Sequence, residues 1–199
     1  MNKNSPQKSP KVYIAGPDVF SPNWPVFANR VKELCHKRSL IPLFPVPVDF
    51  NPCNPGIPGL TEQGTPEQAT PIFKTCVDLI KQADFIVANI SSFRGPEPDG
   101  GTVFEVGYAF ALGKPIVGYS RNKELPENMK DMNRVKTATG AFLCESHVVE
   151  RFGLVANVMV DRACEVVCRG DIDKALDQIV RLFNDKNKIT PWTNKSVDE

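Results

Sequence analysis

Short apolar runs alternate with longer amphipathic segments along this chain, and this alternation constrains its fold more than any other feature. Apolar runs that stop at Gly, Pro or a polar residue are typical of buried strands, whereas apolar residues three and four apart are typical of helices. Strands are expected at 11–17, 41–48, 84–90 and 115–119, and a fifth strand or docking segment at 155–160. The alternation predicts an α/β fold: a doubly wound parallel sheet of about five strands with helices on both faces.

The expected helices begin at recognisable capping residues. A polar N-cap followed by Pro is a common helix start, because Pro lacks the amide that the first turn leaves unpaired. Three starts are expected: Ser21-Pro22 before a helix over 24–38, Thr70-Pro71 before one that includes 72–80, and Asp171 before one that runs to Phe183. A further helix contains Glu105 and ends at Gly113, and residues 120–150 are expected to cross the surface, with some helix at 127–136.

Length and composition indicate one domain. The 199 residues fit a single domain over 11–185, with a disordered tail over 1–10 and a polar tail over 186–199. A net charge of +1 argues against nucleic acid as a partner, since a phosphate backbone is neutralised by an excess of clustered Lys and Arg. We therefore expect a globular protein with small-molecule partners.

The chain shows no membrane or secretion signal at the level of sequence. It has no apolar run of the roughly 18–20 residues that span a bilayer, and residues 1–10 are polar rather than signal-like. A cytoplasmic location is expected, and the six cysteines are then expected as free thiols. The scattered Cys and His residues do not predict a metal site.

Glu105 is the only charged residue between Gly100 and Gly113, in an otherwise mostly apolar run. Burying an unpaired carboxylate costs several kcal/mol, so its presence calls for a reason. One reason is a capping box, because Thr102 and Glu105 have the required spacing. The other is a pocket, in which a dry environment and the nearby Asp99 adapt the carboxylate for covalent or acid–base chemistry.

The expected topology favours the pocket. In parallel sheets, ligands bind beyond the carboxyl ends of the strands, where the strand order reverses. The loops at those ends carry most of the unusual residues, namely Tyr13, Asp18, Asp99, Glu105 and a long Pro- and Gly-rich loop over 49–65. Loops of that length in compact domains are often lids or binding loops.

Familiar catalytic motifs are missing from the sequence. Gly16-Pro17 does not continue into a dinucleotide-binding turn, no triphosphate-binding loop is present, and no Gly-x-Ser-x-Gly elbow occurs. Carboxylates and a tyrosine remain as the candidate chemical groups. They suit glycosyl transfer, in which Asp and Glu stabilise or trap an oxocarbenium-like centre.

Four segments of the chain resemble the nucleoside 2-deoxyribosyltransferase family: residues 12–20 (VYIAGPDVF), 83–90 (ADFIVANI), 93–109 (FRGPEPDGGTVFEVGYA) and 152–159 (FGLVANVM). The third is the most specific, because Asp-Gly-x-Thr-x-x-Glu-x-Gly from Asp99 to Gly107 joins a sugar-binding acid to a nucleophile at fixed spacing. The resemblance implies a flavodoxin-like domain that needs no cofactor. It also implies transfer of the deoxyribosyl group of a 2′-deoxynucleoside to another nucleobase.

The resemblance also implies roles for individual residues. Glu105 would be the nucleophile that forms a covalent deoxyribosyl ester, Tyr13 would orient its carboxylate, and Asp99 would bind a sugar hydroxyl. Asn157 would reach the 5′-hydroxyl from a neighbouring subunit, so that the active site requires a homo-oligomer. The remaining substrate-binding residues would be Gly16, Asp18, Phe20 and Asp49.

Several alternatives stay open at the level of sequence. Family members often have Asp or Asn where this chain has Cys76, so the group that protonates the leaving base is not identified, and Asp78 would point elsewhere on its helix. The chain could instead be a deoxynucleoside or deoxynucleotide N-glycosidase, with a 5′-phosphate near Ser91, Ser92 and Arg94. A nucleotide-sensing module without catalysis is the third possibility.

Overall fold

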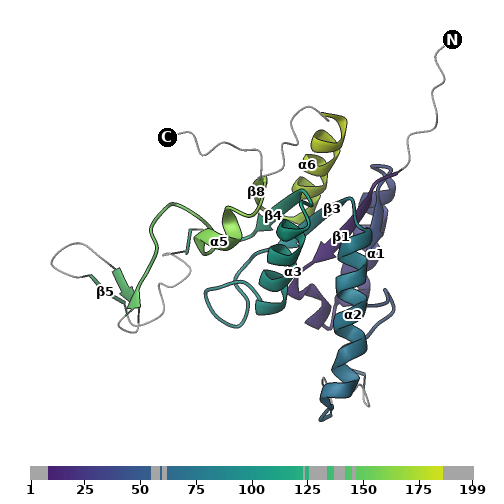
Figure 1. Cartoon of the computed structure of the whole chain (residues 1–199), viewed down its shortest axis with the longest axis horizontal. Coiled ribbons are helices and arrows are strands. Elements are labelled where there is room, and N and C mark those ends of the chain that lie inside the picture. Colours follow the sequence, from purple (N-terminus) through teal and green to yellow (C-terminus); the bar gives the residue numbers. More distant parts are fainter. Residues whose placement is uncertain are drawn as a thin grey trace.

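The computed structural model of the chain describes residues 9–54, 59, 62–122, 124–125, 134–136, 142–144 and 147–185 (Figure 1). Its centre is a five-stranded parallel sheet made of β1 (Lys11–Ala15), β2 (Ile41–Leu43), β3 (Phe85–Asn89), β4 (Ile116–Ser120) and β8 (Val166–Arg169). A small antiparallel sheet consists of β5 (Arg134–Lys136), β6 (Phe142–Cys144) and β7 (His147–Val148), and lies away from the parallel sheet.

The parallel sheet has the strand order β2-β1-β3-β4-β8, which confirms the doubly wound fold predicted from the alternation of runs. The chain moves outward from β1 to β2 and then returns to place β3 on the other side of β1. The order therefore reverses between β1 and β3, where Tyr13 pairs with Ile86. All residues of β3 and β4 are buried, as expected of strands covered on both faces.

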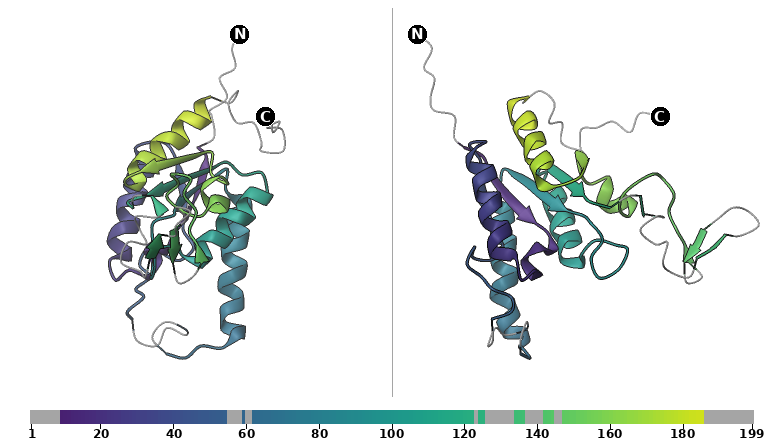
Figure 2. Two further views of the ribbon diagram at one scale, coloured as in Figure 1. Left: turned by 90° about the vertical axis from the view of Figure 1, so that its left-hand side faces the viewer. Right: turned by 180° about the vertical axis from the view of Figure 1, so that it is seen from behind.

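Helices cover both faces of this sheet (Figure 2). On one face α1 (Trp24–His36) and α6 (Ile172–Asn184) bury Val31, Ile172 and Ile179 against the strands. On the other face lie α2 (Pro66–Gln82), α3 (Gly100–Ala111) and the short α5 (Val158–Asp161). A 3-10 helix, η1 (Pro17–Phe20), follows β1 directly.

Two predicted helix starts are wrong. The helix α1 begins after Asn23, and the Ser21 hydroxyl accepts a hydrogen bond from the Asn23 amide rather than capping the helix itself. The helix α2 begins five residues earlier than Thr70-Pro71 predicts, because Thr65 and Gln68 form a reciprocal capping box.

The segment over 155–160 is not a strand. Val155 and Ala156 are buried against the sheet, which fits the docking alternative. The Asn157 side chain then accepts a hydrogen bond from the Met159 amide and starts α5. The fifth strand is β8, in the apolar run over 166–168.

The excursion after β4 contains a strand where a helix was predicted, since 134–136 forms β5. The rest of that predicted helix, over 127–133, lies outside the described residues, as do residues 1–8 and 186–199, where terminal tails are expected. Among the helices that the structure describes, none combines the length and the hydropathy needed to cross a bilayer.

Gly16, between β1 and η1, offers a direct test of this packing. A Cβ atom added at Gly16 would lie 2.8 Å from the Cβ of Asn89 on the neighbouring strand, and the φ of +154° disfavours other residues. We expect Gly16→Ala to lower the free energy of unfolding by about 1–3 kcal/mol, measured by urea denaturation.

Gly107→Ala is the matched control, because a Cβ at this position of α3 would meet no atom within 4 Å outside its own helix. Replacing a helical Gly by Ala is expected to stabilise by up to about 1 kcal/mol. Equal stability of the Gly16→Ala variant and the wild type would contradict the close approach of β1 and β3.

Candidate active site

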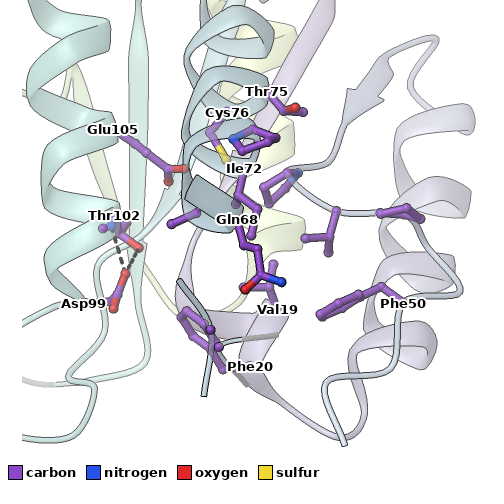
Figure 3. Close-up of a pocket in the computed structure, with 18 of the residues that line it drawn as sticks. Val19, Phe20, Phe50, Gln68, Ile72, Thr75, Cys76, Asp99, Thr102 and Glu105 are labelled. Atoms are coloured by element: carbon purple, nitrogen blue, oxygen red, sulfur yellow. Dashed lines mark hydrogen bonds between the residues drawn. The ribbon is translucent and has the colours of Figure 1, made fainter. Parts of the chain in front are cut away.

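A cavity of about 970 Å³ opens at the carboxyl ends of β1 and β3, where the strand order reverses. The helices α2 and α3 and the loop after β2 supply most of its walls (Figure 3). The lining residues are Gly16, Val19, Phe20, Pro45, Val46, Pro47, Phe50, Gly59, Gly64, Thr65, Pro66, Gln68, Ala69, Pro71, Ile72, Thr75, Cys76, Asp99, Gly101, Thr102 and Glu105. This is the place that parallel-sheet topology predicts for a ligand.

Glu105 and Tyr13 form a hydrogen-bonded pair in this region. The hydroxyl of Tyr13, a fully buried residue of β1, donates to Oε1 of Glu105 at 2.5 Å. Glu105 lies in the second turn of α3, with its carboxylate directed toward α2 and Cys76 (Figure 3). The pair joins residues 92 positions apart in the sequence.

The capping-box interpretation of Glu105 is wrong. The N-cap of α3 is Asp99, whose Oδ2 accepts from the Thr102 amide at 2.9 Å and from the Thr102 hydroxyl at 3.1 Å. Because Thr102 is already the third helical residue, its hydroxyl does not cap the helix. Glu105 therefore takes no part in capping the helix, and it lines the cavity. Asp99 both caps α3 and lines the cavity.

Burial dominates the electrostatics of the pair. It raises the pKa of Glu105 from 4.5 to about 7; the Tyr13 hydrogen bond lowers this pKa and the Asp99 charge raises it. Burial and the adjacent Glu105 raise the pKa of Tyr13 above its usual value, so the hydroxyl stays a donor at neutral pH. The site therefore holds a carboxylate that changes protonation near neutral pH.

Cys76 extends the cluster from the α2 side. Its thiol lies beside the Tyr13 hydroxyl, and burial raises its pKa, so the thiol is protonated at neutral pH. Asp78 points away from the cavity, as the sequence predicted: it forms an ion pair with Lys81 at 3.1 Å on the exposed side of α2.

Of the expected substrate-binding residues, Gly16 and Phe20 line the cavity, whereas Asp18, Asp49 and Asn157 are not among its lining residues. The Asp18 carboxylate accepts a hydrogen bond from the side-chain amide of Asn89 at 2.8 Å and another from the Tyr119 hydroxyl at 3.5 Å. These bonds connect η1 to the ends of β3 and β4. Asn157 caps α5, and its amide donates to Glu150 Oε1 at 2.8 Å.

Several lining residues were not predicted from the sequence, including Gln68, Ile72 and Thr75 on α2. Gln68 was missed because the helix start was misplaced, although Thr65 and Gln68 carry the capping-box spacing that would have found it. Ile72 and Thr75 lie within the predicted helix, and no local signal shows that they line a cavity. Asn89, which holds Asp18 and is not among the lining residues, was also missed. A polar side chain at the carboxyl end of a buried strand is the sequence feature that could have identified it. Within the part of the chain that the structure describes, no group of three or more His, Cys, Asp or Glu is arranged to hold a metal.

Comparison with known proteins gives a consistent result. Residues 12–159 match the family described as Nucleoside 2-deoxyribosyltransferase. An uncharacterized protein of Schizosaccharomyces pombe is 30% identical over 135 residues, and the match covers 66% of this chain and 60% of that protein. The matched part is thus less than two thirds of the length of this curated relative.

Two solved structures are among the similar proteins, and the first supports the family match. A 2-desoxiribosyltransferase from Leishmania mexicana is 31% identical, with a TM-score of 0.63 and coverage of 86% of this chain and 97% of that chain. A 2-deoxyribosyltransferase from Bacillus psychrosaccharolyticus is 25% identical, with a TM-score of 0.43 and coverage of 57% and 74%, respectively. The family match extends over 148 consecutive residues and includes Tyr13 and Glu105, the hydrogen-bonded pair of which Glu105 lines the cavity. The chain belongs to the nucleoside 2-deoxyribosyltransferase family.

Proposed function

We propose that this protein transfers the 2-deoxyribosyl group between nucleobases through a covalent ester on Glu105. The observation that carries the proposal is the partly buried Glu105 carboxylate, oriented by the Tyr13 hydroxyl at the edge of a large, mainly apolar cavity. A retaining double displacement requires a carboxylate held beside the anomeric carbon. Membership in the family supports the same activity.

In the first step, Oε2 of Glu105 attacks C1′ of the deoxynucleoside as the glycosidic bond breaks. The bonding electron pair leaves with the base, which takes up a proton. Tyr13 keeps its proton and holds Oε1, so that Oε2 is the oxygen presented to the sugar. In the second step, a nitrogen of the incoming base attacks C1′, releases the Glu105 carboxylate and gives up its proton, which balances the proton taken up by the departing base.

Asp99 is proposed to hold the sugar. Both of its hydrogen bonds to Thr102 fall on Oδ2, and we assign Oδ1 to a sugar hydroxyl. The helix start fixes the position of this carboxylate, because the same side chain caps α3. A 2′-hydroxyl on the sugar would withdraw electrons from the oxocarbenium-like centre, which favours 2′-deoxynucleosides as donors.

The protein is further proposed to act as a homo-oligomer, with Asn157 of one copy placed against the sugar of a neighbouring active site. Within its own chain, Asn157 is held by Glu150 and the Met159 amide at the start of α5. That anchoring would give the side chain a fixed position from which to meet a second copy.

The proposal predicts base exchange that depends on Glu105. Incubation of 2′-deoxyinosine with adenine should yield 2′-deoxyadenosine and hypoxanthine, measured by chromatography. Glu105→Gln should lower the exchange rate at least about a thousandfold, because it removes the nucleophile while keeping a hydrogen-bond acceptor for Tyr13. Glu33→Gln, on the exposed face of α1, is the control and should exchange at the wild-type rate.

The products separate the competing functions. Hypoxanthine without deoxyadenosine would show a hydrolase in place of a transferase. Binding of the nucleoside without turnover, tested also with thymidine and deoxynucleotide donors, would favour a sensing module. Exchange at the wild-type rate in Glu105→Gln would contradict the covalent mechanism.

The proposal also predicts the pH dependence of catalysis. Because Glu105 must be ionised to attack, kcat/KM for the donor should rise with pH through about 7 and then level off. The Tyr13 hydrogen bond lowers the pKa of Glu105, so Tyr13→Phe should move the midpoint upward. A shift of about one unit is expected, since one unit corresponds to about 1.4 kcal/mol, the scale of one such hydrogen bond.

Tyr119→Phe is the matched control for this measurement. Tyr119 is the other fully buried strand tyrosine, and its hydroxyl donates to Asp18 rather than to Glu105. Its midpoint should equal that of the wild type. A downward shift in Tyr13→Phe, or equal shifts in both variants, would count against the role of Tyr13.

A further inference from the structure

We infer that the Cys76 thiol gives its proton to the departing nucleobase and, as a thiolate, takes a proton from the incoming one. This inference rests on the proposed function and concerns the proton that base exchange has to move. Cys76 lies on α2, lines the cavity and interacts with both Tyr13 and Glu105. These three side chains are called the proton cluster below.

The proton cluster joins three elements at one point of the cavity. Tyr13 comes from β1, Cys76 from α2 and Glu105 from α3. Figure 3 shows the sulfur of Cys76 near the Glu105 carboxylate, between α2 and α3. A base bonded to C1′ beside Glu105 therefore has its ring nitrogens next to the α2 wall, where the thiol lies.

Before the reaction, Cys76 holds its proton. Burial raises the pKa of its thiol, the Tyr13 hydrogen bond lowers this pKa, and the charge of Glu105 raises it, with a net rise. Among the described residues, these are the titratable side chains that act on the thiol, and Asp99 acts in turn on Glu105. Above a pH of about 7, the pKa of Glu105, the carboxylate is ionised while the thiol is protonated, as the first step requires.

Ester formation removes one of the causes that keep the proton on sulfur. When Oε2 of Glu105 bonds to C1′, the carboxylate loses its negative charge and no longer disfavours a thiolate at Cys76. The Tyr13 hydroxyl, which had donated to Oε1, is then available to the thiolate. The negative charge passes from Glu105 to Cys76, so the proton cluster accommodates one charge throughout and never two.

Bonds and protons balance over the two steps. In the first step, the C1′–N bond breaks, its electron pair goes to the base, and the S–H proton of Cys76 joins a ring nitrogen. In the second step, the thiolate takes the N–H proton of the incoming base while that nitrogen bonds to C1′. The electron pair of the ester bond returns to Glu105, and both side chains regain their starting forms.

A thiol suits this role because its acidity is close to that of a nucleobase. The ordinary pKa of a thiol is about 8.5, and the ring N–H of a free purine is likewise a weak acid that ionises in the alkaline range. Proton transfer between them is therefore nearly balanced in both directions, as reversible exchange requires. A carboxylate with a pKa of about 4 is too weak a base to take a proton from the incoming base efficiently.

The test compares a donor whose base needs a proton with one whose base does not. Hypoxanthine leaves 2′-deoxyinosine with a proton, whereas 7-methylguanine leaves 7-methyl-2′-deoxyguanosine without one, because its methyl group already supplies the positive charge. In single turnovers with the enzyme in excess, Cys76→Ser should release hypoxanthine at least about a hundredfold more slowly than the wild type. Release of 7-methylguanine, corrected for the rate without enzyme, should stay within about twofold. Serine retains a hydrogen-bonding group of similar size but is too weak an acid to replace the thiol.

Cys53→Ser is the matched control, because Cys53 is an exposed free cysteine that does not line the cavity. It should release both bases at the wild-type rates. Wild-type release of hypoxanthine by Cys76→Ser, or an equal loss with both donors, would overturn the inference and leave the proposed function intact. Absence of both products with the wild type would instead count against the proposed function.

A second measurement decides the inference even if the wild type releases neither base. Iodoacetamide reacts with thiolates, so the rate of Cys76 alkylation against pH, followed by mass spectrometry of its peptide, reports the pKa of the thiol. Because the charge of Glu105 raises that pKa, Glu105→Gln should move the midpoint to lower pH. Glu33→Gln, on the exposed face of α1, should leave it unchanged. Equal midpoints in Glu105→Gln and the wild type would show that the two groups are uncoupled and would overturn the inference.

Discussion

The hydrogen bond from Tyr13 to Glu105 is the interaction around which the site is built. Glu105 is partly buried and its carboxylate is costly to ionise there, and the Tyr13 hydroxyl offsets part of that cost while fixing one carboxylate oxygen. The bond can form because β1 is an inner strand, between β2 and β3, and α3 packs on the face of the sheet that carries Tyr13. The strand order reverses between β1 and β3, and the cavity that Glu105 lines opens at this point.

The layers of the fold were predictable because each strand and helix carries its own periodic pattern. The start of α6 at Asp171 was predictable as well, but two other helix starts were not, because the chain offers more than one capping residue near each of them. Thr65 and Thr70 are both followed by Pro, and Gln68 decides between them by completing the capping box of the first. Asp99 and Thr102 were likewise both possible N-caps of α3, and the Asp99 side chain is the one that caps the helix.

The candidate site was predictable in its chemistry and less so in its contacts. Glu105 stood out as a single charge in an apolar run, and the resemblance to a family linked it to Tyr13 and Asp99. The pairing of Asp18 with Asn89 depends on the distance between two neighbouring strand ends, which no local pattern encodes. On the α2 side, Gln68 was missed because the helix begins five residues earlier than predicted, whereas Ile72 and Thr75 were within the predicted helix and nothing local shows that they line the cavity.

The long sequence separation between Tyr13 and Glu105 has a consequence for the chain during its synthesis. Tyr13 is made 92 residues before its partner, so the pair is a late, non-local contact in folding. Until α3 docks on the sheet, Glu105 is a solvated acid with the ordinary pKa of 4.5. The tuned carboxylate thus exists only in the assembled domain, and its titration near neutral pH would report that folding of the centre is complete.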